Sequence, residues 1–262
     1  MLEIKDLWGG YGAQPVLRGV EFTACSGQVT VILGPNGCGK STLLKALCGI
    51  VRPERGSITL NGRSLSDLSR NELARTVAYL AQNRRVPDIT AGRLVLHGRF
   101  PYLGYPRRYR AGDYAIAGEA MKKLGIEELA DIPLGNLSGG QRQKVYIAMA
   151  LAQDTPVILL DEPTTYLDIR HQLRLMQHAR RLADAGKAVL MVIHDISHAM
   201  RVADRIILMN KGIIAAQGTP EQVYISGALE QVFGVKVSRV QQPDGWHYCC
   251  EAAQEEDICA HM

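Results

Sequence analysis

The sequence predicts an α/β fold, with a mainly parallel sheet covered by helices on both faces. Short runs of Val, Ile and Leu stand at 29–33, 157–160 and 188–193, and segments with helical spacing of apolar residues separate them. A glycine-rich loop joins the first run to a helical segment at 40–50. Continuous apolar runs that alternate with helices are typical of buried parallel strands in βαβ units.

The N-terminal third follows a different pattern. Residues 2–7, 16–24 and 57–63 alternate apolar and polar side chains, and the last segment contains an Asn-Gly pair. Alternation with such a turn signal is typical of antiparallel strands. We therefore predict a small antiparallel β subdomain beside the α/β core.

The glycine-rich segment GPNGCGKST at 34–42 fits the G-x-x-x-x-G-K-[ST] phosphate-binding pattern, after a strand and before a helix. Its glycines let backbone N–H groups close around phosphate oxygens, and a helix start favours anions. Lys40 is expected to reach the outer phosphates of a nucleotide, and the Ser41 hydroxyl to bind Mg²⁺. The predicted nucleotide-binding residues are Gly34, Pro35, Asn36, Gly37, Cys38, Gly39, Lys40, Ser41 and Thr42.

Cys38 lies inside this loop, beside the start of a helix. A helix N-terminus lowers the pKa of a thiol. We hypothesise that Cys38 has a lowered pKa, so that its covalent modification would block nucleotide binding.

Acidic residues end a later strand. The run at 157–160 is followed by Asp161 and Glu162, which places both at the carboxyl edge of the sheet, where α/β folds bind ligands. Alone, this would be a strand and an acidic turn. Beside a phosphate loop, Asp161 is the predicted Mg²⁺ carboxylate, either in direct contact with the ion or behind its direct ligands, and Glu162 is the predicted general base. The strand at 188–193 brings His194 to the same edge, where it either enters the site or is structural. These residues predict a P-loop NTPase.

Residues 88–135 are rich in helix formers and contain the loop FPYLGYPRRYR at 100–110, so we predict a mostly helical insertion. Between residues 84 and 110 the only acid is Asp88. This segment is either a solvated basic face or a surface for anionic lipid headgroups or an acidic partner. Its arginines are Arg84, Arg85, Arg93, Arg99, Arg107, Arg108 and Arg110.

LSGGQ at 137–141 is a second glycine-rich helix start. Ser138 and Gln141 form a capping-box pattern, and Gly139 and Gly140 leave the first N–H groups of the helix open, as an anion site requires. An ordinary capped helix is the alternative, although glycines in a first turn carry an entropic cost.

Taken in order, these motifs resemble those of the ATP-binding-cassette (ABC) ATPases from about residue 2 to 235. Gln82 in YLAQN matches the glutamine loop, LSGGQRQK the signature, TTYLD ending at Asp168 the D-loop, and VIHD the switch histidine. The resemblance implies a RecA-like P-loop NTPase core with an N-terminal antiparallel β subdomain and an inserted α-helical subdomain. We expect an ABC ATPase domain at 1–235, with its core at 1–87 and 146–235, a helical insertion at about 88–145, and a C-terminal tail at 236–262.

The resemblance also implies that ATP is hydrolysed with Mg²⁺ in a head-to-tail dimer of two copies of the chain. Ser138, Gly139, Gly140 and Gln141 of one copy would close over the γ-phosphate held by Lys40 of the other. The implied catalytic residues are Glu162, which polarises water, His194, which contacts the γ-phosphate, and Gln82, which senses Mg²⁺ and water. Ser41, Gln82 and Asp161 are the implied Mg²⁺ residues, and Asp168 communicates across the dimer. Tyr11 would stack on adenine; the alternative is an exposed loop aromatic.

A finer resemblance links the chain to the ATPase subunits of bacterial importers for ferric siderophores, haem and cobalamin. It is carried by HGRFPYLG at 97–104, the AM-x-x-LGI helix at 120–126 and TTYLDIRHQL at 164–173. It implies two transmembrane permease subunits, indirect work with an extracytoplasmic substrate-binding protein, and a peripheral position on the cytoplasmic face of the inner membrane. Charge reversal at Arg99 or Arg107 is expected to weaken permease docking. The sequence does not identify the cargo.

Two alternatives lie within the same superfamily. A soluble ATPase switch in translation or DNA repair would usually fuse two cassettes or insert a long coiled coil, and the sequence shows neither. A non-hydrolytic regulatory module is disfavoured by the presence of Glu162 and His194.

Composition excludes other classes. No apolar run approaches the roughly 20 residues of a membrane-spanning helix, and the start MLEIKDLWGG lacks the pattern of a secretory signal. The net charge of +4 is too small to indicate a nucleic-acid partner, and the six cysteines form no spaced disulfide framework, which favours a reducing, cytoplasmic compartment. Residues after 236 are predicted to form a flexible tail. The alternative, a metal or redox sensor, is disfavoured because no recognised zinc module has the spacing of His247, Cys249, Cys250, Cys259 and His261.

Overall fold

The computed structural model describes residues 1–12, 14–82, 86–164, 167–243 and 245–252. Within these ranges a central sheet has the strand order β10-β9-β3-β8-β7-β6. The strands from β9 to β6 pair in parallel, and β10 is an antiparallel edge strand. The strand bounds are Val29–Leu33 (β3), Val77–Leu80 (β6), Val157–Asp161 (β7), Ala188–Val192 (β8), Arg205–Asn210 (β9) and Ile213–Gly218 (β10).

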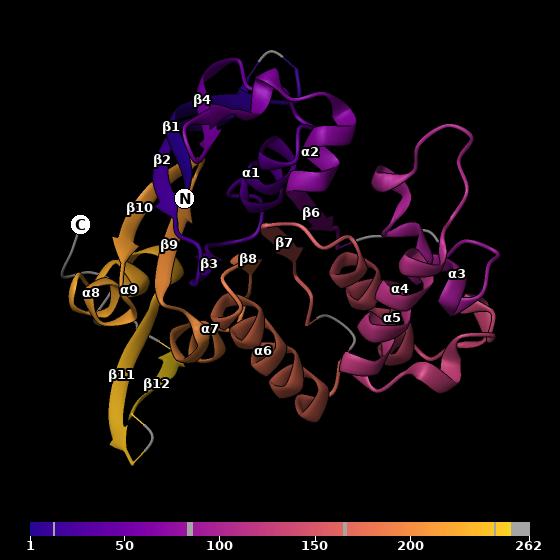
Figure 1. Ribbon diagram of the computed structural model, residues 1–262. Coiled ribbons are helices and arrows are strands. Elements are labelled where there is room, and N and C mark those ends of the chain that lie inside the picture. Colours follow the sequence, from indigo (N-terminus) through magenta and orange to yellow (C-terminus); the bar gives the residue numbers. More distant parts are fainter. Residues whose placement is uncertain (13, 83–85, 165–166, 244, 253–262) are drawn as a thin grey trace.

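The prediction of an α/β fold is confirmed, because β3, β7 and β8 are apolar runs buried along their whole length. Helix α1 (Lys40–Leu47) contributes to one apolar cluster on the sheet. Helices α6 (Ile169–Asp184) and α7 (Ile196–Val202) contribute to the other. Figure 1 shows α1 on one side of the sheet and α6 and α7 on the other.

The predicted antiparallel subdomain is also present. Strands β1 (Leu2–Gly10), β2 (Pro15–Ala24), β4 (Arg55–Leu60) and β5 (Arg63–Ser64) form a second sheet in the order β2-β1-β4-β5. Its inner face joins the same apolar cluster as α1. The short helix α2 (Arg70–Thr76) follows and leads directly into β6.

The segment predicted as a helical insertion contains α3 (Ala91–His97), α4 (Ala111–Leu124) and α5 (Gly139–Ala152). Three short 3₁₀ turns stand between them in the described residues, at Phe100–Tyr102, Glu127–Leu129 and Leu134–Asn136. These helices lie together at one side of the molecule (Figure 1). Helix α5 is continuous to Ala152, so the helical part extends past residue 145, where the sequence placed its end.

The sequence suggested that Arg99 belongs to an exposed docking surface, but the residue is buried. Its side chain is 10% exposed, its Nε lies 3.3 Å from Asp113 Oδ1, and its Nη1 donates to the carbonyl of Ala152 at 3.0 Å. The guanidinium also lies 3.9 Å from the centre of the Tyr102 ring. Arg99 therefore ties α3 and α4 to the end of α5, whereas Arg107 is exposed. Arg84 and Arg85 lie outside the described residues.

The prediction of a flexible tail from residue 236 is wrong up to residue 252. Strands β11 (Val235–Gln242) and β12 (Gly245–Ala252) form an antiparallel hairpin that packs on α7 and projects from the molecule (Figure 1). Val237 and Tyr248 are buried, and the Ser197 hydroxyl donates to the carbonyl of Tyr248 at 2.7 Å. The segment looked patternless because Val240 and Trp246 are exposed although apolar, whereas the polar Ser238 and Arg239 are half-buried. The remaining helices are α8 (Pro220–Ile225) and α9 (Ala228–Phe233).

Two negative findings concern the described residues alone. None of their helices is long and apolar enough to cross the hydrocarbon core of a bilayer. They contain no group of three His, Cys, Asp or Glu side chains placed to hold a metal ion. Cys259 and His261 lie outside the described residues.

Candidate functional site

The phosphate loop connects β3 to α1 through backbone conformations that favour glycine. Gly34 has a φ of +150°, and a Cβ at this position would lie 2.3 Å from the carbonyl oxygen of Met209 and 2.7 Å from Cys38 Sγ. Gly39, the residue before α1, is left-handed with a φ of +108°. Side chains at these positions would collide or strain the turn, so the glycines give a concave loop lined by backbone.

Lys40 opens α1, and its side chain is folded inside this loop. Its Nζ donates to the carbonyl of Gly34 at 2.6 Å and to that of Pro35 at 2.8 Å. The residue is buried, so its charge is held in the concavity instead of in bulk solvent. A buried cation within a ring of backbone groups is suited to a polyanionic ligand.

Asp161 is the last residue of β7 and is 2% exposed. Its Oδ1 accepts a hydrogen bond from the Ser41 hydroxyl at 3.1 Å, and its Oδ2 accepts one from the Tyr79 hydroxyl at 3.0 Å. Burial raises the pKa of Asp161, and the two hydroxyl donors act in the opposite direction. A hydroxyl and a carboxylate are hard oxygen ligands of the kind Mg²⁺ takes, so the donor set fits this ion.

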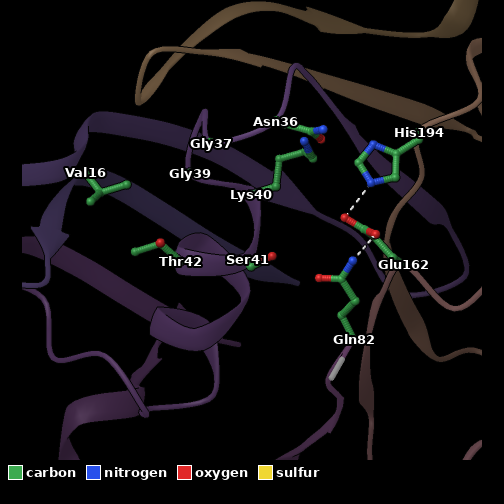
Figure 2. Close-up of a pocket in the computed structure, with 10 residues that line it drawn as sticks. All are labelled: Val16, Asn36, Gly37, Gly39, Lys40, Ser41, Thr42, Gln82, Glu162 and His194. Atoms are coloured by element: carbon green, nitrogen blue, oxygen red, sulfur yellow. Dashed lines mark hydrogen bonds and ion pairs between the residues drawn. The ribbon is translucent and has the colours of Figure 1, made fainter. Parts of the chain in front are cut away.

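Glu162 follows Asp161 but points elsewhere, because its backbone is left-handed with a φ of +48°. Figure 2 shows its carboxylate between Gln82 and His194. The Gln82 amide nitrogen donates to Oε2, and His194 Nε2 lies 2.5 Å from Oε1. Gln82 and His194, which were predicted from separate motifs, therefore both contact the carboxylate of Glu162.

These residues and the phosphate loop face the same open cleft of about 410 Å³ (Figure 2). Its walls come from β2, the phosphate loop with α1, and the ends of β6, β7 and β8. The lining residues are Val16, Asn36, Gly37, Gly39, Lys40, Ser41, Thr42, Gln82, Glu162 and His194. Val16 was not predicted, since an apolar residue at the start of a strand carries no chemical signal in the sequence.

Cys38 does not behave as hypothesised. Its side chain is buried, and this burial raises the pKa of the thiol; the nearby Lys40 charge lowers it to a smaller degree. The hypothesis of a lowered pKa is wrong, because the loop folds the sulfur away from solvent toward Gly34.

Tyr11 lies outside the cleft lining, and so does the start of α5, the signature helix that begins within LSGGQ. Tyr11 is 59% exposed, with the Lys45 ammonium 5.6 Å from its ring centre. Ser138 caps α5 by a reciprocal capping box with Gln141, and Ser138 and Gly139 are exposed. Asp168 caps α6 and accepts hydrogen bonds from the backbone N–H of His171 at 2.8 Å and from its ring. The roles predicted for these residues remain proposals.

The parallel sheet, the phosphate loop on α1 and the carboxylates at the end of β7 define the chain as a P-loop NTPase. The family model for the ABC transporter matches residues 17–165. The iron(3+)-hydroxamate import ATP-binding protein FhuC of Bacillus subtilis is 41% identical over 92% of this chain and 91% of its own length. The ferric enterobactin transport ATP-binding protein FepC of Escherichia coli is 40% identical over 91% of this chain and 89% of its own.

Among solved structures, the dimeric structure of a bacterial ABC transporter cassette superposes with a TM-score of 0.74 at 30% identity. The superposition covers 84% of this chain and 99% of the cassette. The chain belongs to the ABC transporter family, and it is an ATP-binding subunit with ATPase activity.

Proposed function

We propose that the chain is the ATP-hydrolysing subunit of an ABC importer for an iron-siderophore, haem or cobalamin-type substrate. Two copies would work head to tail, peripherally on the cytoplasmic face of the inner membrane, with two transmembrane permease subunits and an extracytoplasmic binding protein beyond them. FhuC and FepC are nearly equally similar to the chain but are named for different siderophores. Their names support the class of cargo and not one compound.

One observation carries the dimer. One chain supplies the phosphate loop and the proposed base Glu162 to the cleft, whereas its Ser138 and Gly139 are exposed and lie outside the cleft lining. Their helix start offers the N–H groups of Gly139 and Gly140, which the capping box does not use, and the positive end of the dipole of α5, a 14-residue helix. In a head-to-tail dimer this helix start would meet the phosphates bound by the other copy.

The residues of the cleft suggest how hydrolysis proceeds. Lys40 would exchange its carbonyl partners for phosphate oxygens when ATP enters the loop. Mg²⁺, held by Ser41 and Asp161, would neutralise charge on the phosphates. Glu162 would accept a proton from the attacking water, once Gln82 or His194 releases one of its oxygens. The exposed Arg107 remains our proposed contact to the permease.

The substitution Glu162→Gln tests the proposed base. The amide cannot accept the proton, so we expect turnover to fall by about 10²-fold or more while ATP binding persists. Size-exclusion chromatography with ATP should show a dimer, because the closed state cannot be left by hydrolysis. Glu119→Gln on the exposed face of α4 is the matched control and should keep parental turnover. Turnover near the parent rate in Glu162→Gln would refute the assignment.

A further inference from the structure

Tyr79 on β6 and Ser41 both contact the carboxylate of Asp161, the proposed Mg²⁺ ligand, but each contacts a different oxygen. The Tyr79 hydroxyl donates to Asp161 Oδ2 at 3.0 Å, whereas Ser41 donates to Oδ1 at 3.1 Å. Each oxygen of Asp161 is thus held by a hydroxyl from a different element. No role was predicted for Tyr79, since a tyrosine in a strand ordinarily contributes to packing.

The sheet fixes the place of this hydroxyl. Strands β6 and β7 are parallel neighbours, with Tyr79 in register with Leu159, two residues before Asp161. The ring is partly buried and packs against the apolar cluster that contains α1. The hydroxyl is therefore preorganised by backbone pairing and by packing, whereas the terminal torsion of an aspartate is intrinsically broad.

We propose that Tyr79 is a positioning residue for the Mg²⁺ site, an inference that rests on the proposed metal role of Asp161. By holding Oδ2, it fixes the plane of the carboxylate and leaves Oδ1 beside the Ser41 hydroxyl. Mg²⁺ requires near-ideal octahedral geometry and tolerates a misplaced ligand poorly. Partners that orient a metal ligand typically account for 10- to 100-fold in metal affinity.

The test is the affinity for a non-hydrolysable ATP analogue, measured by calorimetry with Mg²⁺ and with EDTA. The ratio of the two dissociation constants reports the contribution of the metal, and it involves neither hydrolysis nor a permease. In Tyr79→Phe we expect unchanged affinity in EDTA and a metal-dependent gain about tenfold smaller than in the parent. Failure of this result would leave the function itself standing, because turnover of Glu162→Gln tests that separately.

Tyr102→Phe is the matched control. Its hydroxyl also donates a partly buried hydrogen bond, but to the backbone carbonyl of Gln153 at 2.9 Å instead of to Asp161. This variant should keep the full metal-dependent gain and a melting temperature close to that of Tyr79→Phe. A full gain in Tyr79→Phe would overturn the proposal, and so would an equal loss with Mg²⁺ and with EDTA, which would indicate general damage to the loop.

A second background isolates the contact with the carboxylate. In Asp161→Asn there is no carboxylate to orient, so adding Tyr79→Phe should leave the residual metal-dependent gain unchanged. A further loss in the double variant would show that Tyr79 acts through another group, and it would also overturn the proposal.

Discussion

Asp161 and Glu162 are neighbours in sequence but occupy opposite environments. Asp161 completes β7 and is shut into the protein between two hydroxyl donors. The left-handed backbone of Glu162 turns the next carboxylate into the cleft, toward His194. One strand end therefore supplies both our proposed Mg²⁺ ligand, which is buried, and our proposed base, which lines the cleft; the backbone conformation of Glu162 separates the two carboxylates.

Removing the charge of Asp161 should stabilise the ligand-free chain. Its pKa is raised by burial above the unfolded value of about 3.9, so ionisation at neutral pH costs folding free energy. The folded chain binds more protons than the unfolded chain between the two pKa values, and stability rises as pH falls through that window. We therefore expect Asp161→Asn to raise the free energy of unfolding at pH 8.

Urea unfolding at pH 8 and pH 4.5, without nucleotide or metal, measures this effect. The advantage of Asp161→Asn should shrink as the pH falls toward the unfolded pKa of about 3.9, because protonation of the folded parent progressively removes the same cost. Asp131→Asn at an exposed position is the control and should change little at either pH. A variant that is less stable than the parent at pH 8 would contradict the prediction.

At the scale of elements, the sequence predicted the helices and strands whose signal lies within a few consecutive residues. The apolar runs gave the buried strands, and Ser138 with Gln141 gave the start of α5, because a capping box forms between neighbours in sequence. The hairpin of β11 and β12 was missed because the apolar alternation of β11 breaks at Ser238 and Arg239, and because its partner, α7, lies far away in the chain. Tyr79 was missed because Asp161 is also distant in the chain, and only the β6–β7 register brings the two residues together.

The hairpin should contribute measurably to stability through Tyr248, which is 6% exposed and packs edge-to-face on Tyr224 at 5.3 Å. Truncating a buried aromatic side chain costs about 3–5 kcal/mol. For a chain of this size, each kcal/mol lowers the melting temperature by roughly 2–4 °C. We therefore expect calorimetry to show a fall of roughly 6 °C or more in Tyr248→Ala.

Trp246→Ala is the comparison, because this ring belongs to the same strand but is 41% exposed. It stacks on the guanidinium of Arg239 at 4.2 Å, a contact worth about 1 kcal/mol at such a site. Its melting temperature should fall much less. Equal effects of the two substitutions would show that the hairpin does not pack firmly on α7 in solution.

At the scale of the whole molecule, the cleft and the signature helix are separate surfaces of one chain. Lys40 and Glu162 line the same cleft, whereas Ser138 does not. In the head-to-tail dimer we propose, every hydrolytic site takes Lys40 and Glu162 from one copy and Ser138 from the other. This arrangement makes a prediction for mixtures of two inactive variants.

Mixing Lys40→Ala with Ser138→Arg should restore hydrolysis. In a mixed dimer one site carries both substitutions and the other carries neither. With random pairing and independent sites, about a quarter of all sites are intact, so the mixture should reach about a quarter of parental turnover. Steady-state ATPase assays across mixing ratios, with each variant alone as baseline, measure the recovery, and melting curves check that Ser138→Arg, which loses a helix cap, remains folded.

The mixture of Lys40→Ala with Glu162→Gln is the decisive control. Both residues belong to the same cleft, so each site of a mixed dimer keeps one defect, and no turnover should return. If both mixtures stay inactive, or if both recover equally, the shared site is wrong. Recovery in the first mixture alone requires that the helix start at Ser138 acts on nucleotide held by another copy, because no other pairing of the surfaces yields an undamaged site.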